Sequence, residues 1–431
     1  MLITVFNNGN TMNNGVMAMA VALANELRQL RPDYKIEVIL DNPYTSAKDG
    51  ERFTRCGVRT VDSAMGNGLY RYWRLFPLLG PVRFAELLLS RRGNDSTFRL
   101  HTSDAMISLC GEDFFSDNWD IRVSLLTLLY CLSAFITRKP LIVLAQTFGP
   151  FQRGWSRRLA RLCFGRAALV TARDPISYDL VRTLVDHERI ALTSDLAFLL
   201  QPAPLDQVLE RYPEVQPLAG GGFLGVSVSD LFGCSVFHNI NGRAERLQCF
   251  RRTMAELLDH LVERHGLPVV FVPHVTLDHS DDRAAAREVV ALMRHREAVT
   301  LLEQEYTAPE IKTVIGLARA FVGCRMHALI GAVSQAVPTL ALAYSPKTVD
   351  VIGGRLGYPF VIDLRDADPT TASAGMAIRL DALFADLEGV RKELHQAVQT
   401  RMIPEARRNV ELLVAALETP NLALATQRSR P

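Results

Sequence analysis

The chain has 431 residues, of which 48% are hydrophobic and 22% are charged, and its formal net charge is +2. This length exceeds one ordinary hydrophobic core and predicts two domains, and the composition excludes a disordered protein. The small net charge gives no general reason to bind nucleic acid, so we expect no such partner. The seven cysteines form neither a CxxC pair nor a Cys/His zinc pattern, which predicts reduced thiols and no metal.

Strand-like and helix-like segments alternate in the N-terminal half, which we place at residues 1–203. The expected strands are Leu2–Phe6, Ile36–Leu40, Ala105–Leu109, Leu141–Gln146, Leu169–Ala172 and Ile190–Leu192. The expected helices lie near Gly15–Leu30, Trp119–Thr137, Ser156–Phe164 and Pro175–Val185. This alternation predicts a mostly parallel sheet covered by helices, as in a Rossmann-like domain.

Residues 204–222 are rich in proline and glycine and are expected to form a linker. A second α/β set follows at residues 223–370. Its expected strands are Phe223–Ser229, Pro268–Val272, Val299–Leu302, Ala320–Gly323, Thr339–Leu342 and Phe360–Ile362. Residues 371–431 form a tail with a helical pattern that we expect to pack back on the domains. Two Rossmann-like domains facing a cleft, with a helical C-terminal tail, resemble the GT-B arrangement, and this analogy concerns the fold alone.

Arg325 and His327 are the strongest chemical signal in the sequence. They stand where an apolar strand gives way to a helix-like run. In extended backbone, residues two apart point to the same side, so both side chains would project beyond the carboxyl edge of the sheet. Open α/β sheets bind ligands at that edge. A guanidinium beside a titratable imidazole suits an anionic substrate that also needs a proton moved.

Other polar residues also follow expected strands. Arg173 follows Leu169–Ala172 and is expected to bind an anion, because the helix cap is already supplied by Asp174. Asp195 is expected either to accept a hydrogen bond from the substrate or to orient Arg173. Lys347 is expected either to contact a phosphate or to remain a solvated lysine in a first helical turn.

His274 follows the strand Pro268–Val272 and is expected at the same edge as Arg325. The acidic residues Asp281 and Asp282 come soon after it, and either one could cap the next helix. The spacing of these histidine and aspartate residues matches no standard zinc motif.

The loop Asn7–Gly15 separates the first expected strand from the first expected helix. Its glycines permit close backbone approach, and the helix N-terminus attracts anions or sugar hydroxyls. The loop is neither a dinucleotide-binding nor a phosphate-binding glycine motif. Its asparagines would otherwise only turn and cap the chain. We expect Asn8, Asn10 and Asn14 to contact a ligand, which the resemblance described below makes the acceptor.

Motifs spread from Val5 to Asp350 together resemble the polysaccharide pyruvyl transferase family. The quoted pieces are Asn8-Gly9-Asn10 through Asn14-Gly15, Gly111-Glu112-Asp113, Gln146-Thr147-Phe148-Gly149-Pro150-Phe151, Ala172-Arg173-Asp174-Pro175-Ile176-Ser177, Ser194-Asp195-Leu196-Ala197-Phe198, Pro273-His274 with Asp281-Asp282, Arg325-Met326-His327-Ala328 and Tyr344-Ser345-Pro346-Lys347. Each piece is weak alone, and their order and spacing make the resemblance specific.

The resemblance implies a GT-B-like fold and transfer of a pyruvyl group from phosphoenolpyruvate to two hydroxyls of a sugar, as a ketal, in bacterial polysaccharide or cell-surface glycan synthesis. It implies that Arg173, Arg325 and His327 form the donor site. We assign Lys347 and His274 to donor binding as well, and His327 and Asp195 to catalysis. No cofactor is expected beyond phosphoenolpyruvate as co-substrate.

The acceptor side is assigned to the N-terminal domain, with Glu112, Asp113 and Gln146 beside the asparagine loop. Relatives often carry a run of glycines where this chain has Gly111-Glu112-Asp113, so the acceptor or the transferred group could differ from the usual one. Two alternatives stay open: a GT-B glycosyltransferase using a nucleotide sugar, and a non-catalytic sugar-binding protein. The sugar acceptor is expected to be lipid- or nucleotide-linked.

The sequence also bears on location. The N-terminus lacks the basic head and long apolar stretch of a signal peptide, so we expect a cytoplasmic protein. The uncharged segment Val123–Ile136 is shorter than the ~20 residues of a membrane span and predicts a buried helix. The segment Leu69–Arg92 mixes aromatic and basic residues, which fits either peripheral contact with the inner face of the membrane or two surface helices with solvated arginines.

Overall fold

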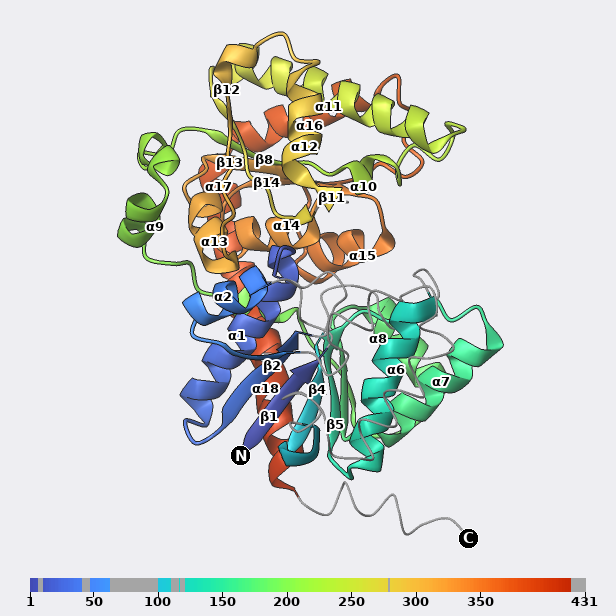
Figure 1. Ribbon diagram of the computed structural model, residues 1–431. Helices are drawn as coiled ribbons and strands as arrows, with labels where there is room; N and C mark the ends of the chain where they lie inside the picture. Colours follow the sequence, from blue (N-terminus) through green and yellow to red (C-terminus); the bar gives the residue numbers. More distant parts are fainter. Residues whose placement is uncertain are drawn as a thin grey trace. The chain divides into compact units, whose positions relative to one another are not determined.

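The computed structural model of the chain describes residues 1–6, 11–40, 47–62, 100–109, 116, 121–277 and 280–419 (Figure 1). The chain forms two compact units. The first contains Met1–Thr11, Val16–Leu200 and Pro404–Pro431, and the second contains Met12–Gly15 and Gln201–Ile403. Each unit is therefore assembled from segments that are far apart in the sequence.

The first unit is built on a parallel sheet with the strand order β3-β2-β1-β4-β5-β6-β7. The strands are β1 (Leu2–Phe6), β2 (Lys35–Leu40), β3 (Arg59–Asp62), β4 (Ala105–Ser108), β5 (Leu141–Gln146), β6 (Leu169–Ala172) and β7 (Ile190–Leu192). The helices are α1 (Asn14–Leu30), α2 (Ala47–Arg55), α6 (Ile121–Ile136), α7 (Gly154–Arg166), α8 (Pro175–Leu184), η2 (Leu196–Leu199) and α18 (Ile403–Glu418). The strand order reverses between β1 and β4, the point where open α/β sheets usually bind ligands.

The second unit repeats this plan with the strand order β12-β9-β8-β13-β14-β15. Its strands are β8 (Leu224–Ser227), β9 (Val269–Phe271), β12 (Val299–Leu301), β13 (Ala320–Gly323), β14 (Thr339–Ala343) and β15 (Val361–Asp363), with a small antiparallel pair of β10 (Thr276–Leu277) and β11 (Ser280–Asp281). All pairs of the larger sheet are parallel, and its order reverses between β8 and β13. The predicted fold class, two Rossmann-like units with a helical C-terminal region, is confirmed.

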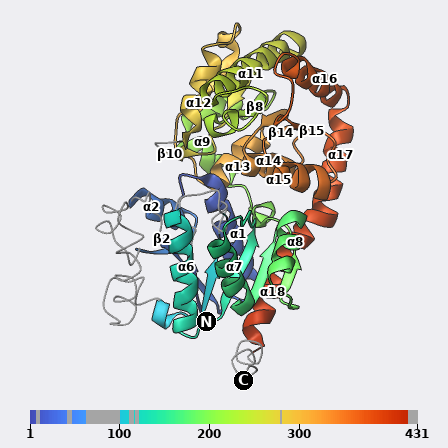
Figure 2. The same cartoon turned by 90° about the vertical axis from the view of Figure 1, so that its right-hand side faces the viewer.

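The helices of the second unit cover both faces of this sheet (Figure 1). They are α9 (Leu205–Arg211), η3 (Pro213–Leu218), α10 (Asp230–Gly233), α11 (Arg243–His265), α12 (Asp282–Val290), η4 (Arg296–Ala298), α13 (Ala308–Gly316), α14 (Met326–Val333), α15 (Pro346–Thr348), η5 (Val349–Arg355), α16 (Ala372–Ala385), α17 (Leu387–Ala397) and η6 (Val398–Met402). Figure 2 shows α16 beside α11. The His265 ring stacks on Phe384 across this contact, with ring centroids 4.1 Å apart.

The segment expected as a linker, residues 204–222, contains α9 and η3. Apolar side chains of both helices are buried in one core cluster of the second unit, together with Phe223 and Ile311. Pro204 and Pro213 do not prevent these helices, because Pro204 precedes α9 and Pro213 begins η3, positions where proline needs no backbone hydrogen bond.

The C-terminal helix α18 is fixed to the first unit by Asn409, which is fully buried. The hydroxyls of Thr171 and Thr193 donate to its Oδ1 at 2.7 and 2.8 Å. Its Nδ2 donates to the backbone oxygen of Ser194 at 2.9 Å. These hydrogen bonds fix the position of α18 along the first unit, because sliding the helix by one turn would leave the buried polar groups of Asn409, Thr171 and Thr193 without these partners.

The apolar segment Val123–Ile136 lies in α6, as predicted, and Tyr130, Cys131 and Ala134 on it are buried. Among the described residues, no helix is long and apolar enough to cross a membrane. The segment Leu69–Arg92 lies outside the described residues, so surface contact with a membrane stays a prediction.

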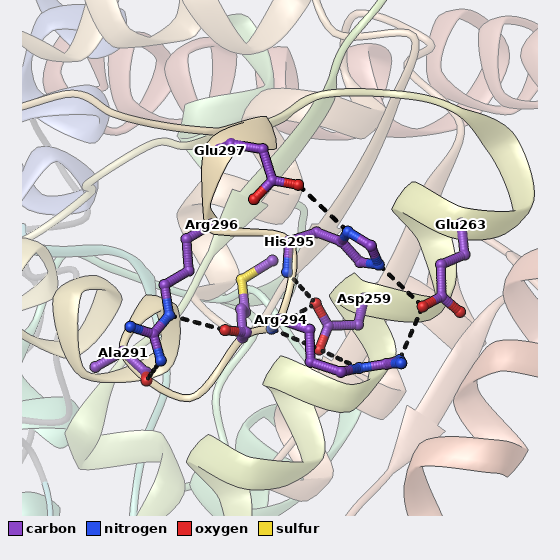
Figure 3. Close-up of polar contacts among 8 residues, drawn as sticks. Asp259, Glu263, Ala291, Arg294, His295, Arg296 and Glu297 are labelled. Carbon is purple, nitrogen blue, oxygen red and sulfur yellow. Dashed lines mark hydrogen bonds and ion pairs between the residues drawn. The ribbon is translucent and has the colours of Figure 1, made fainter.

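An ionic cluster joins α11 to the turn that follows α12 (Figure 3). Asp259 is buried and accepts hydrogen bonds from the backbone N–H groups of Arg294 and His295, each at 3.0 Å. Glu263 and then Glu297 raise the pKa of His295. Because the pKa of His295 is raised in the folded protein, the ion pairs of His295 with Glu263 and Glu297 stabilise the fold at low pH. This stabilisation is lost as the pH rises through the folded pKa.

Candidate functional site

Polar side chains of the second unit follow two strands that flank β8. His274 comes three residues after β9, and Arg325 comes two residues after β13. Both strands pair with β8 in parallel, so their carboxyl ends lie at one edge of the sheet. This edge includes the point where the strand order reverses, which is the usual ligand site of such sheets.

Arg325 is held by a buried carboxylate. Its Nε and Nη2 donate to Oδ1 of Asp282 at 3.1 and 2.7 Å, and Nη2 also donates to the Ser280 hydroxyl at 3.0 Å. Asp282 is 3% exposed, and burial raises its pKa while the neighbouring Arg325 opposes that rise. Among the described residues, Nη1 of Arg325 donates to no hydrogen-bond partner.

The same carboxylate also orders the backbone at His274. Oδ2 of Asp282 accepts hydrogen bonds from the N–H groups of His274 and Val275 at 3.0 and 2.8 Å. The helix-capping role that we left open between two aspartates falls to Asp281, which accepts from the N–H of Arg283 at 2.9 Å. Asp282 is therefore available to connect Arg325 with His274.

Two imidazoles lie beside this ion pair. The rings of His274 and His327 have centroids 6.4 Å apart and planes inclined by 7°. His274 is 4% exposed, and neither of its ring nitrogens has a hydrogen-bond partner among the described residues. Burial lowers the pKa of His274 well below its ordinary value, and the nearby His327 and Arg325 lower it further. A buried, neutral imidazole without partners is costly, and such groups are typical of ligand sites.

This burial predicts a pH effect on stability. The pKa of His274 is depressed in the folded protein, so below about pH 6.5 the unfolded chain binds a proton there that the folded chain does not. The free energy of unfolding therefore decreases as the pH falls. Between pH 7.5 and 5.5 the wild type should lose about 1 kcal/mol more than His274→Gln. Urea unfolding of both proteins at the two pH values measures this difference. Equal losses would show that His274 is protonated in the folded protein.

A segment from the beginning of the chain also reaches this site. Met12–Gly15 belongs to the second unit, although the sequence predicted it to be part of the N-terminal domain. Asn13 forms an antiparallel bridge with Val275, and the backbone N–H of Asn14 donates to the backbone oxygen of His274 at 3.1 Å. No sequence signal marks this pairing, because isolated bridges have no hydrophobic periodicity.

Arg173 and Asp195 lie in the first unit and form a buried ion pair. Nη1 of Arg173 donates to Oδ2 of Asp195 at 2.7 Å, and its Nε donates to Thr147 Oγ1 at 2.8 Å. Asp195 also caps η2 by accepting from the N–H of Ala197 at 2.8 Å. The side chains are 3% and 0% exposed. This arrangement matches the expectation that Asp195 orients Arg173. Donor binding by Arg173 and a catalytic role of Asp195 stay predictions.

The other expected residues are distributed between the two units. Gln146 is buried in the first unit, where its Nε2 donates to the backbone oxygen and the hydroxyl of Ser108 at 2.6 and 3.0 Å. Lys347 lies partly buried in the short helix α15, directly after β14, the strand next to β13. Asn8, Asn10, Glu112 and Asp113 lie outside the described residues. Over the described part of the chain, no group of three or more His, Cys, Asp or Glu side chains is arranged to hold a metal ion.

Comparison with known proteins gives a family. The family model for polysaccharide pyruvyl transferase matches residues 15–346. The amylovoran biosynthesis protein AmsJ of Erwinia amylovora is 21% identical over 416 residues, which cover 94% of this chain and 97% of AmsJ.

Solved structures of other proteins share the fold at low sequence identity. The UDP-GlcNAc 2-epimerase of Neisseria meningitidis, bound to UDP-GlcNAc, superposes with a TM-score of 0.57 at 11% identity and 96% and 99% coverage of the two chains. HepE of Anabaena, in complex with UDP and glucose, gives a TM-score of 0.55 at 11% identity, with 96% and 100% coverage. At this identity the likeness concerns the fold alone.

Proposed function

Because the chain belongs to the polysaccharide pyruvyl transferase family, we propose that it transfers a pyruvyl group from phosphoenolpyruvate to two hydroxyls of a sugar, forming a ketal. The family and the relative AmsJ support a transferase in polysaccharide biosynthesis. The observation that carries the finer proposal is the ion pair of Arg325 and Asp282 beside the parallel rings of His274 and His327. These residues all belong to the second unit.

The donor fits the charges of this site. Phosphoenolpyruvate carries a carboxylate and a phosphate, and an arginine binds either with directed, charge-assisted hydrogen bonds. Asp282 occupies Nε and Nη2 of Arg325 and so orients the guanidinium while leaving Nη1 for the donor. The N-terminus of α14 begins at Met326, directly after Arg325, and adds a favourable field for an anion. Lys347 is assigned to the same donor as a further cation.

The chemistry requires proton transfer at defined atoms. The methylene carbon of the donor gains a proton, a sugar hydroxyl attacks the adjacent carbon, and phosphate leaves with the electrons of the carbon–oxygen bond. The second hydroxyl then attacks the same carbon. Each of the two hydroxyls loses its proton: one of these protons balances the proton added to the methylene carbon, and the other leaves with the phosphate. We assign the first proton transfer to His327, since a histidine can act as acid and base near neutral pH.

We assign the acceptor to the first unit, with Gln146, Asn8 and Asn10 as expected contacts, whereas Asn14 belongs to the second unit. Asp195 was assigned to catalysis together with His327. Its ion pair with Arg173 supports an indirect contribution, in which the pair holds the carboxyl ends of β6 and β7 in place. A lipid- or nucleotide-linked sugar remains our proposed acceptor, and peripheral membrane contact remains a proposal that rests on residues outside the described ranges.

The test is release of inorganic phosphate from phosphoenolpyruvate by the purified full-length protein. A panel of free, nucleotide-linked and lipid-linked sugars serves as acceptors, and mass spectrometry identifies the product. We expect phosphate release only in the presence of an acceptor, with a product heavier by one pyruvyl ketal. Transfer of a sugar from a nucleotide sugar, without phosphate release from phosphoenolpyruvate, would instead establish the glycosyltransferase alternative.

A further inference from the structure

The segment Met12–Gly15 lies directly against the two histidines of the second unit. The backbone oxygen of Met12 accepts from the N–H of Thr276 at 2.9 Å, and the N–H of Asn14 donates to the oxygen of His274 at 3.1 Å. The Asn13 side chain accepts from the N–H of Gly15 at 3.0 Å and so caps the first turn of α1. These bonds fix the backbone of Gly15 beside the site.

Gly15 approaches His327 so closely that no side chain fits. A Cβ added at Gly15 would overlap the His327 ring, with Nδ1 nearest, Cγ at 2.5 Å and Cε1 at 2.9 Å. Glycine in a helix ordinarily costs about 0.5–1 kcal/mol relative to alanine. The close approach explains why the first turn of α1 carries it.

We propose that Gly15 is a positioning residue for His327, setting the orientation of its imidazole against the donor. This inference rests on the proposed function for its kinetic consequence, although the contact itself does not. The ring of His327 occupies the space that a Gly15 side chain would fill and lies parallel to the ring of His274, so Gly15 limits how far this ring can turn. Proton transfer is sensitive to such placement, and a displacement of ~1 Å can cost about 10²-fold in rate.

The kinetic test compares Gly15→Ala with the matched variant Gly375→Ala. Gly375 lies in α16, and a Cβ added there meets no atom within 4 Å. Gly15→Ala should lower kcat by about 10²-fold with little change in KM for phosphoenolpyruvate, because the atoms nearest to the added methyl group belong to His327 and not to Arg325 or Asp282. Gly375→Ala should keep wild-type kinetics. Wild-type kcat in Gly15→Ala would overturn the inference.

A second measurement does not depend on the reaction. The side-chain NMR resonances of His327, assigned by comparison with His327→Ala, report the environment and tautomer of its ring. Gly15→Ala should shift these resonances, whereas Gly375→Ala should not. If Gly15→Ala shifts the His327 resonances but the wild-type protein releases no phosphate with any acceptor, the positioning role is supported and the proposed function is wrong. Unshifted resonances would overturn the positioning role even if pyruvyl transfer is observed.

Stability provides a third, independent comparison. Gly15→Ala should destabilise the wild type, because the added methyl group collides with the ring, and should be neutral or stabilising once the ring is removed in His327→Ala. If Gly15→Ala changes the free energy of unfolding equally in the wild type and in His327→Ala, the glycine is needed for a reason other than the His327 ring.

Discussion

Replacing His327 by asparagine should reduce turnover by about 10²–10⁴-fold while the fold and most of the donor affinity are retained. This is the usual cost of removing a general acid or base. Asparagine is polar and smaller than histidine, so it fits beside Gly15 without a steric clash. The measurement is the single-turnover rate of phosphate release at saturating phosphoenolpyruvate, together with the thermal transition of the protein.

The matched control is His395→Asn, which makes the same chemical change at an exposed position of α17. It should leave turnover unchanged. If His327→Asn turns over at nearly the wild-type rate with an intact thermal transition, the acid/base role belongs elsewhere. His274 is the first candidate, since it is buried next to His327 and its two ring nitrogens have no hydrogen-bond partner in the described part of the chain.

Replacing Arg325 should weaken donor binding by about 10- to 150-fold, which corresponds to ~1.5–3 kcal/mol for a charge-assisted hydrogen bond. Arg325→Ala should also destabilise the second unit, because it leaves the buried carboxylate of Asp282 without its cation. Arg325→Lys should recover stability better than binding, since lysine supplies charge without the fork geometry. Calorimetric titration with phosphoenolpyruvate and urea unfolding measure the two effects.

The double variant Arg325→Leu with Asp282→Asn separates binding from stability. Neutralising both partners removes the unpaired charge, so stability should recover relative to Arg325→Ala while donor affinity remains low. Arg283→Ala is the control, because Arg283 pairs with Asp281 in the adjacent turn and not with the site. Unchanged affinity for phosphoenolpyruvate in Arg325→Ala would show that Arg325 does not bind the donor.

Several features of the fold could be predicted from local sequence. Buried parallel strands read as short apolar runs, which predicted β1, β5 and β13. The helix start at Pro175 was predicted from its cap, and Asp174 does accept from the N–H of Ser177 at 2.8 Å. Short polar strands such as β3 were not predicted. The sequence of β3 has no clear strand pattern, and its pairing with β2 stabilises it as a strand.

The chemistry of the site depended on tertiary structure to a greater extent. The sequence by itself determined that Arg325 and His327 follow a strand, because strand polarity and the carboxyl-edge rule are local properties. The prediction that both residues lie in extended backbone was wrong, because α14 begins at Met326 and His327 lies in its first turn. It could not decide that Asp282 holds Arg325, since either of two adjacent aspartates could cap α12 and only packing distinguishes them. It offered the pairing of Asp195 with Arg173 as one of two expectations and could not choose between them, because a strand-end arginine looks the same whether it faces a ligand or a carboxylate.

The contact of Gly15 with His327 was least accessible from the sequence. The two residues are more than 300 positions apart, and a glycine before a helix has several local explanations. Only the folded chain, which places Met12–Gly15 against the loop after β9, shows that the space of a side chain is already filled by an imidazole. Sequence patterns report periodicity and caps, which are local, whereas van der Waals exclusion between distant segments is decided by packing.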